Sequence, residues 1–246
     1  MPSPPPAPPS SWRASAEAAV RRLAAITGVG VLLGLLVGGI GGRLAMLLLA
    51  RLNPEATGVT SDDGFRIGQF TVPDTLNLLV VGYALGLIGA GVYALVRVLM
   101  IGPRWFQVLS VAGGPAIVVG SMIVHTDGVD FRLLGPVWLA IALFVAIPGV
   151  YAALLTLLAE RLIGVDGWAM RARFPVVAAL LVLWAPLAPA LALLAALWAA
   201  LEALRRSHRL ARPLAHPAVP WAGRASLVVV FLLSLIDLTQ DAVALT

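Results

Sequence analysis

The sequence carries runs of about 20 consecutive apolar residues, and no other feature limits its fold as strongly. An α-helix needs about 20 residues to cross the ~30 Å hydrocarbon core of a bilayer. A soluble helix of that length would show a polar face at helical spacing, and these runs have none. Charged residues make up only 12% of the 246-residue chain and hydrophobic residues 60%, whereas a soluble domain carries roughly 25% charged residues. An integral membrane protein is therefore predicted.

Six hydrophobic segments are separated by short polar loops. The predicted fold is an all-α polytopic transmembrane bundle, with residues 21–246 as a single domain. The fifth segment contains Pro186 and Pro189, which interrupt a regular helix. It is either an ordinary crossing or a re-entrant hairpin that returns to the side it came from. The segments cover residues 23–42, 76–96, 105–124, 136–159, 175–201 and from 225 onward.

The N-terminal stretch "MPSPPPAPPSS" has six prolines in its first nine residues. Such a sequence cannot form a helix and is typical of extended polyproline II chain. Residues 1–20 are predicted to be a disordered tail. The first apolar run is too long for a cleaved signal peptide and has no small-residue cleavage site after it, so it is interpreted as an uncleaved anchor.

The arginines predict the orientation in the plasma membrane. The N-terminal region has three of them against one glutamate, which places it in the cytoplasm, and the acidic loop after the first segment lies outside. The loop after the fifth segment is the most basic in the chain, so a single fifth crossing would break the rule. The net charge of +5 does not indicate nucleic-acid binding, because no basic face with interleaved aromatics occurs.

Glycines recur at every fourth residue in the first two segments, a spacing that lines one helix face and lets backbones approach closely. The lipid bilayer is the expected surrounding. The pattern favours packing within the chain, while a second copy or another membrane protein is the alternative partner. The predicted packing residues are Gly30, Gly34, Gly38, Gly42, Gly82 and Gly86, with Ala90 continuing the second face.

Three charged residues are candidates for charges within the membrane. Arg43 follows the first glycine face, and Asp237 comes after only twelve apolar residues of the last segment, with Asp241 one turn further on. Arg43 is either an interfacial arginine with its head at the lipid phosphates or a buried charge that pairs with Asp237 or lines a polar cavity. Glu160, beside Arg161 at a predicted cytoplasmic helix end, is interpreted as part of an interfacial ion pair.

Two predicted external loops, "SDDGF" and "HTDGVDF", each combine Asp-Gly with a second carboxylate. Asp-Gly is first of all a turn sequence. The alternative is a divalent-cation site for Mg²⁺, Mn²⁺ or Ca²⁺, although the spacing matches no established metal loop. Otherwise no cofactor is expected. The candidate ligands are Asp62, Asp63, His125, Asp127 and Asp130.

Three stretches are informative beyond their composition, namely "GGRLAMLLLARLNPEATGVTSDDGFRIGQFT", "HTDGVDF" and "LIDLTQDAVAL". Through them the sequence resembles a group of uncharacterised multi-pass membrane proteins of high-GC bacteria, and the resemblance extends over most of the chain after the tail. It implies a membrane location and makes both loops typical features. No activity is assigned to the group, so the resemblance transfers no catalytic residues.

The function classes follow from these features. Because no recognised catalytic pattern occurs, the sequence favours a non-catalytic membrane scaffold or accessory subunit. A small transporter or channel with a polar path around Arg43, Asp237 and Asp241 is the second class, because intramembrane charges and broken helices are features of such paths. An enzyme with an external metal site is a distant third.

Overall fold

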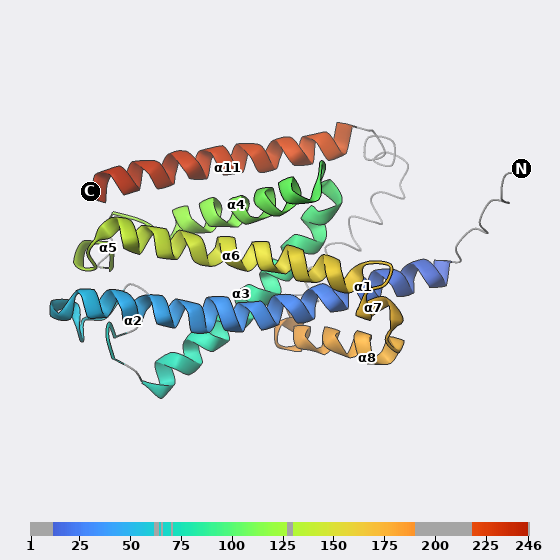
Figure 1. Cartoon of the computed structure of the whole chain (residues 1–246), viewed down its shortest axis with the longest axis horizontal. Helices are drawn as coiled ribbons and strands as arrows, with labels where there is room; N and C mark the ends of the chain where they lie inside the picture. The colour runs from blue at the N-terminus through green and yellow to red at the C-terminus, as the bar shows by residue number, and fades with distance from the viewer. Residues whose placement is uncertain are drawn as a thin grey trace, which may run out of the picture.

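The computed structural model of the chain describes residues 12–61, 64, 66–69, 71–126, 130–189 and 218–245. Five of its helices are long and apolar enough to cross a membrane, and most of them run side by side along one direction, with α3 oblique to the others (Figure 1). Apart from one isolated bridge between Thr60 and Arg66, the elements in the described part of the chain are helices. The predicted all-α fold is confirmed.

The first helix is continuous over 41 residues. It comprises α1 (Trp12–Leu33), the π-helical segment η1 (Gly34–Gly41) and α2 (Gly42–Leu52). Residues 12–20, expected to belong to the disordered tail, are helical. After the last proline of the tail this stretch is rich in alanine, a strong helix former, and Glu17 pairs with Arg21 one turn later at 2.8 Å. The helix therefore starts soon after the prolines end.

Four more helices have the length of a membrane span. They are α3 (Val72–Val96), extended by the 3₁₀ turn η3 (Arg97–Leu99), α4 (Arg104–Ile123), α6 (Val137–Ile163) and α11 (Ala218–Leu245). Most of their ends lie within four residues of the predicted ends. The exception is α11, which starts seven residues early and runs to Leu245. Arg224 can lie within this helix because its Nε donates to the carbonyl of Leu99 at 2.9 Å.

The fifth predicted segment is not a long helix in the part that the structure describes. After the one-turn helix α7 (Trp168–Arg171), the chain forms α8 (Phe174–Ala178) and continues as the 3₁₀ helix η4 (Ala179–Leu187). In Figure 1 this element starts at the N-terminal end of the bundle and stops partway along it. The remainder of the predicted segment lies outside the described residues. The structure therefore describes five helices of spanning length and one short apolar helix, where the sequence predicted six segments.

The bundle has two ends of different character. The basic end holds the start of α1, η3, the start of α4, the end of α6, α7 and the start of α11. The loop end holds α2, the short helices η2 (Pro54–Ala56) and α5 (Asp130–Leu133), and the end of α11 (Figure 1). Each end has its own cluster of buried apolar side chains, with Leu155 among those of the basic half and Leu49 among those of the loop half.

Candidate functional site

At the loop end, the two predicted external loops are joined by the buried side chain of Asn53. Its Nδ2 donates to the carbonyl of Gly135 at 2.7 Å, and its Oδ1 accepts from the Gly135 N–H at 2.8 Å. A second donation from Nδ2 satisfies the Leu49 carbonyl at the end of α2. Because Asn53 follows α2 directly, this amide holds the second loop against the end of the first helix.

The first loop doubles back on itself, as its Asp-Gly sequence predicts. The Gly64 N–H donates to the Ser61 carbonyl at 2.9 Å, and Gly64 has a φ of +80°, which favours glycine. The Ile67 N–H then donates to the Val59 carbonyl. The corresponding Gly128 of the second loop lies outside the described residues, and the chain after it forms the single turn α5.

Arg43 lies beneath both loops and is buried, with 7% of its surface exposed. Its Nη2 donates to the carbonyl of Gln69 at 2.6 Å. Asp130 is equally buried and lines the same small pocket, so the structure brings Arg43 and Asp130 together. The cavity measures about 10 Å³, which is room for about one water molecule. Its lining residues are Arg43, Met46, Leu47, Ser61, Arg66, Ile67, Gly68, Asp130, Leu134 and Phe144.

Of the five candidate metal ligands, the structure describes His125 and Asp130, while Asp62, Asp63 and Asp127 lie outside the described residues. Within the described ranges, no group of three His, Asp or Glu side chains is placed to hold a metal ion. Asp130 shares its pocket with Arg43 and Arg66. A carboxylate that lines one pocket with two arginines is better suited to a charge-assisted hydrogen bond than to cation binding.

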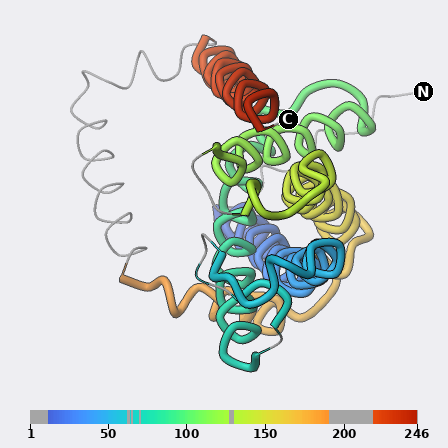
Figure 2. Tube along the Cα trace, turned by 90° about the vertical axis from the view of Figure 1, so that its left-hand side faces the viewer, coloured from blue at the N-terminus to red at the C-terminus, as the bar shows by residue number. Residues whose placement is uncertain are grey.

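Asp237 and Asp241 lie elsewhere. Viewed from the loop end, α11 runs beside α4 at the edge of the bundle, away from α2 (Figure 2). Leu238 is the buried residue of α11, Asp237 is exposed, and neither aspartate lines the pocket that contains Arg43. The rotation of α11 about its axis therefore turns the carboxylate of Asp237 outward instead of toward Arg43.

The predicted glycine faces of the first two segments lie against each other. A Cβ added at Gly30 would stand 2.7 Å from the Gly86 carbonyl oxygen, and one at Gly86 would stand 2.5 Å from the Gly30 carbonyl oxygen. A Cβ at Gly34 would overlap the Gly82 carbonyl oxygen. The two helices are thus in backbone contact, which no larger residue at these positions would permit.

The far end of the glycine face departs from the prediction. Gly38 makes ordinary contact with Gly82, and a Cβ at Gly42 would meet nothing within 4 Å. Gly39, which was not predicted, lies against Leu79 instead. The reason is η1: a π-helix has a wider turn than the 3.6 residues of an α-helix, so the four-residue spacing drifts away from α3 after Gly34.

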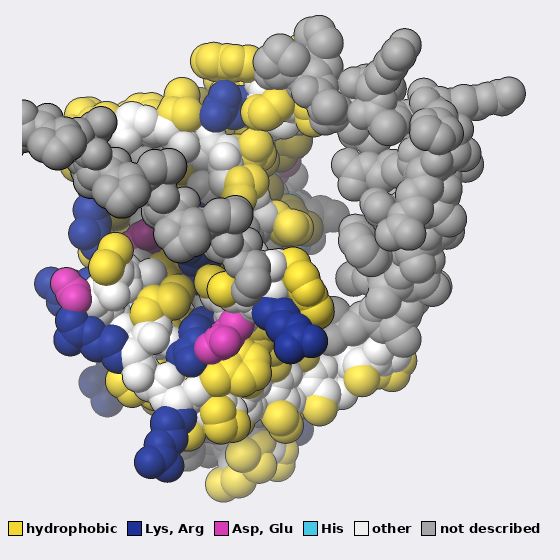
Figure 3. Space-filling model, turned by 90° about the vertical axis from the view of Figure 1, so that its right-hand side faces the viewer, with side chains coloured by type: hydrophobic (Ala, Val, Ile, Leu, Met, Phe, Trp, Pro, Cys, Tyr) yellow, Lys and Arg dark blue, Asp and Glu magenta, His cyan; other side chains and the backbone are white. Residues whose placement is uncertain are grey.

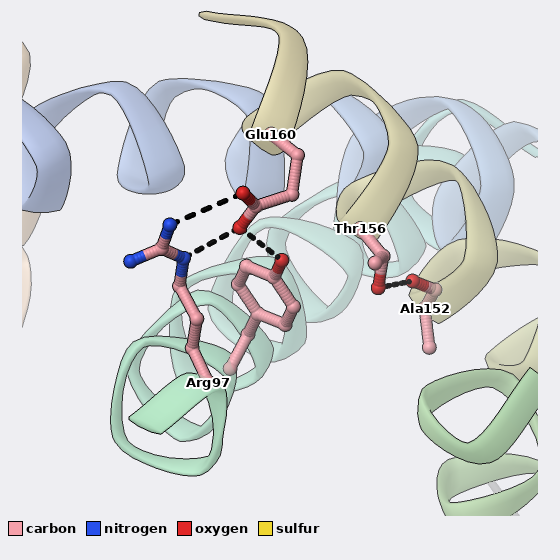
Figure 4. A network of polar contacts seen from close by, with 5 residues as sticks. Arg97, Ala152, Thr156 and Glu160 are labelled. Atoms are coloured by element: carbon pink, nitrogen blue, oxygen red, sulfur yellow. Dashed lines mark hydrogen bonds and ion pairs between the residues drawn. The ribbon is translucent and has the colours of Figure 1, made fainter. Parts of the chain in front are cut away.

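At the basic end, three side chains form a polar cluster that joins α3 to α6 (Figure 4). Arg97 donates from Nε and Nη2 to the two carboxylate oxygens of Glu160, at 2.5 and 3.1 Å, and the Tyr93 hydroxyl donates to Oε1 at 3.0 Å. Glu160 does form an ion pair, as the sequence predicted. Its partner is Arg97 and not the neighbouring Arg161, which is exposed.

Side-chain hydrogen bonds hold the short fifth element against α1 and α3. In a 3₁₀ helix each N–H donates to the carbonyl three residues earlier, and Pro186 has no N–H, so the Leu183 carbonyl has no partner within η4. The hydroxyl of Tyr83 donates to this carbonyl. Trp184 Nε1 donates to Thr27 Oγ1 at 2.9 Å. Arg21 fixes the preceding turn by donating to the carbonyls of Ala169 and Ala172.

No family model, curated protein or solved structure matches the chain. The described part of the chain defines a class of fold: it is helical and contains five helices long and apolar enough to cross a membrane. Within that class the chain is marked by a glycine contact between its first two spanning-length helices and by a small pocket beneath its two loops that contains Arg43 and Asp130. The membrane-protein resemblance noted from the sequence stays a prediction.

Proposed function

We propose that the chain is a multi-pass plasma-membrane protein with its basic end in the cytoplasm, acting as a non-catalytic scaffold or accessory subunit. The five apolar helices and the large exposed apolar side chains along them, such as Leu95 and Val243, support a lipid environment. Each of these five helices exposes apolar side chains that a water-soluble fold would bury. The excess of arginine at one end supports the orientation.

The observation that carries the scaffold function is the packing around Arg43. A transport path needs a polar cavity that continues through the bundle, whereas the pocket at Arg43 has room for about one water molecule. Below it, the glycine backbones of the first two spanning-length helices are in direct contact. Such an interior suits a protein that presents surfaces to partners.

A small transporter or channel is the second candidate, and the fifth element favours it. Substrate sites in transporters are often built from discontinuous helices that end within the membrane. The element Phe174–Leu187 is bonded at Leu183 to Tyr83, near the middle of α3. We propose that this element is re-entrant, since α8 and α11 both start at the basic end (Figure 1).

Flux measurements separate the two candidates. Liposomes that contain the purified protein are expected to be no more permeable to protons, K⁺ or Cl⁻ than protein-free liposomes. Arg43→Gln is expected to lower the free energy of unfolding by about 1–3 kcal/mol, because it leaves the partly buried Gln69 carbonyl without its partner, whereas Asp237→Asn changes little. A flux that either substitution abolishes would establish the transporter.

Cross-linking tests the scaffold itself. The chain contains no cysteine, so single cysteines at the exposed positions Leu95, Leu109 and Val229 report on α3, α4 and α11 separately. We expect a discrete cross-linked product with another protein chain in native membranes from at least one position. If all three cysteines remain free of protein cross-links while reacting with a lipid-soluble thiol reagent, the scaffold function is wrong.

A further inference from the structure

The charge of the molecule is concentrated at one end. Among the described residues, the basic end carries nine arginines and three carboxylates, a net charge of +6, whereas the loop end carries four arginines and five carboxylates, a net charge of −1. Figure 3 looks onto the basic end and shows arginine side chains spread among apolar ones. The basic residues are Arg13, Arg21, Arg22, Arg97, Arg104, Arg161, Arg171, Arg173 and Arg224.

Several of these arginines are engaged within the protein. Arg97 is paired with Glu160, Arg171 is paired with Asp166, and Arg21 donates to main-chain carbonyls of the α7 turn. Arg224 donates to Leu99 and lies over the ring of Trp221. Their guanidinium groups already have partners and hold the elements of this end together.

Three others are exposed and have no such partner. Within the described ranges, the side chains of Arg22, Arg161 and Arg173 make no hydrogen bond or ion pair. Arg22 is the residue after Arg21, which holds the α7 turn. Arg173 lies between Ala172 and Phe174, and Arg21 contacts both: it donates to the Ala172 carbonyl and lies over the Phe174 ring. Each free guanidinium has five N–H donors in a fork that matches a phosphate group.

Tryptophans place these arginines at the depth of lipid headgroups. Trp105, Trp168 and Trp221 all lie at the basic end and expose between 48% and 65% of their surface. Exposed tryptophans gather where the apolar core of a bilayer meets its headgroups. In a bilayer, this depth would put the free arginines of the same end beside the phosphates.

We propose that the basic end binds anionic phospholipid headgroups, with Arg22, Arg161 and Arg173 as the phosphate-binding side chains. The inference rests on the proposed membrane placement and deepens it by naming the lipid class. Zwitterionic lipids also carry a phosphate, but their compensating positive charge removes the long-range attraction. A surplus of positive charge at the headgroup level selects for lipids with a net negative charge.

Tryptophan quenching by brominated lipids measures this selectivity. The purified protein is reconstituted into vesicles in which either the phosphatidylglycerol or the phosphatidylcholine carries bromine, and the relative binding constant is taken from the quenching. The wild type is expected to prefer phosphatidylglycerol, and the preference is expected to shrink as salt is raised. The Arg22→Gln, Arg173→Gln double variant is expected to lose up to about fivefold of the preference per arginine.

A matched variant at the loop end serves as the control. Arg51→Gln, Arg132→Gln removes two exposed arginines there and is expected to leave the preference unchanged. Equal quenching by both lipids in the wild type overturns the lipid inference while leaving the membrane placement intact. An equal loss in the control variant also overturns it. If neither brominated lipid quenches, the membrane placement itself fails.

Discussion

At the scale of single residues, the cluster around Glu160 has the most direct consequences. Its carboxylate accepts hydrogen bonds from Tyr93 on α3 and from Arg97, four residues later at the start of η3, so the two donors lie on one face of the helix. The side chains of Arg97 and Glu160 are 32% and 27% exposed, so water weakens their attraction only in part. The pair therefore joins α3 to α6 with a contribution above that of a fully exposed ion pair.

A double-mutant cycle with Arg97→Gln and Glu160→Gln tests this pairing. We expect a coupling free energy of about 1 kcal/mol in unfolding experiments on the purified protein, since the pair is charged but only partly buried. The parallel cycle with Arg161→Gln and Glu160→Gln is expected to show none. Coupling to Arg161 instead of Arg97 would contradict the geometry.

At the scale of elements, the contact between α3 and the α1–η1 part of the first helix depends on the absence of side chains. Gly34 and Gly86 lie so close that a Cβ on Gly34 would stand 2.6 Å from the Gly86 Cα, and main-chain atoms cannot move aside as a flexible side chain can. The four-residue spacing of glycines correctly predicted the contact face of the first helix at Gly30 and Gly34. The same spacing failed at Gly42, because the π-helical segment lies between Gly34 and Gly42.

Gly34→Ala and Gly42→Ala form a matched pair on the same helix. Gly34→Ala is expected to lower the free energy of unfolding by about 1–3 kcal/mol, as overpacking does. Gly42→Ala is expected to be neutral or to stabilise by up to about 1 kcal/mol, because alanine favours a helix and the site is open. Thermal unfolding in detergent would measure both, and equal effects would show that the contact is not tight.

At the scale of the whole molecule, the described chain starts at the basic end with Trp12 and finishes at the loop end with Leu245 (Figure 1). The start of α11 is held at the basic end by the bond from Arg224 to Leu99. Residues 174 and 218 therefore lie at the same end. This shared end is the observation on which the proposed re-entrant form of the fifth segment rests.

Topology reporters test this arrangement. A reporter active only outside the cytoplasm is expected to be active when fused to the C-terminus. Single cysteines give an independent reading: in intact cells, a membrane-impermeant thiol reagent should label Val59→Cys at the loop end and not Val165→Cys at the basic end, both being exposed in the structure. Cytoplasmic activity of the C-terminal reporter would rule out the re-entrant segment.

The sequence by itself determined the helical class, the approximate bounds of most long helices and the unequal charge of the two ends. These features depend on local quantities, namely the length of an apolar run, the position of prolines and the arginines that flank each run. The sequence also predicted the bend of the first loop. An Asp-Gly turn depends only on adjacent residues such as Gly64, so it can be predicted locally.

Only the tertiary structure decided which polar groups meet. Glu160 binds Arg97 from another helix and not its neighbour Arg161, and Arg43 lines a pocket with Asp130 while Asp237 faces outward. Which face of a helix meets its neighbour depends on rotation about the helix axis. That rotation is set by the packing of distant segments and, in the first helix, by a π-helical turn, and neither can be read from residues near in sequence.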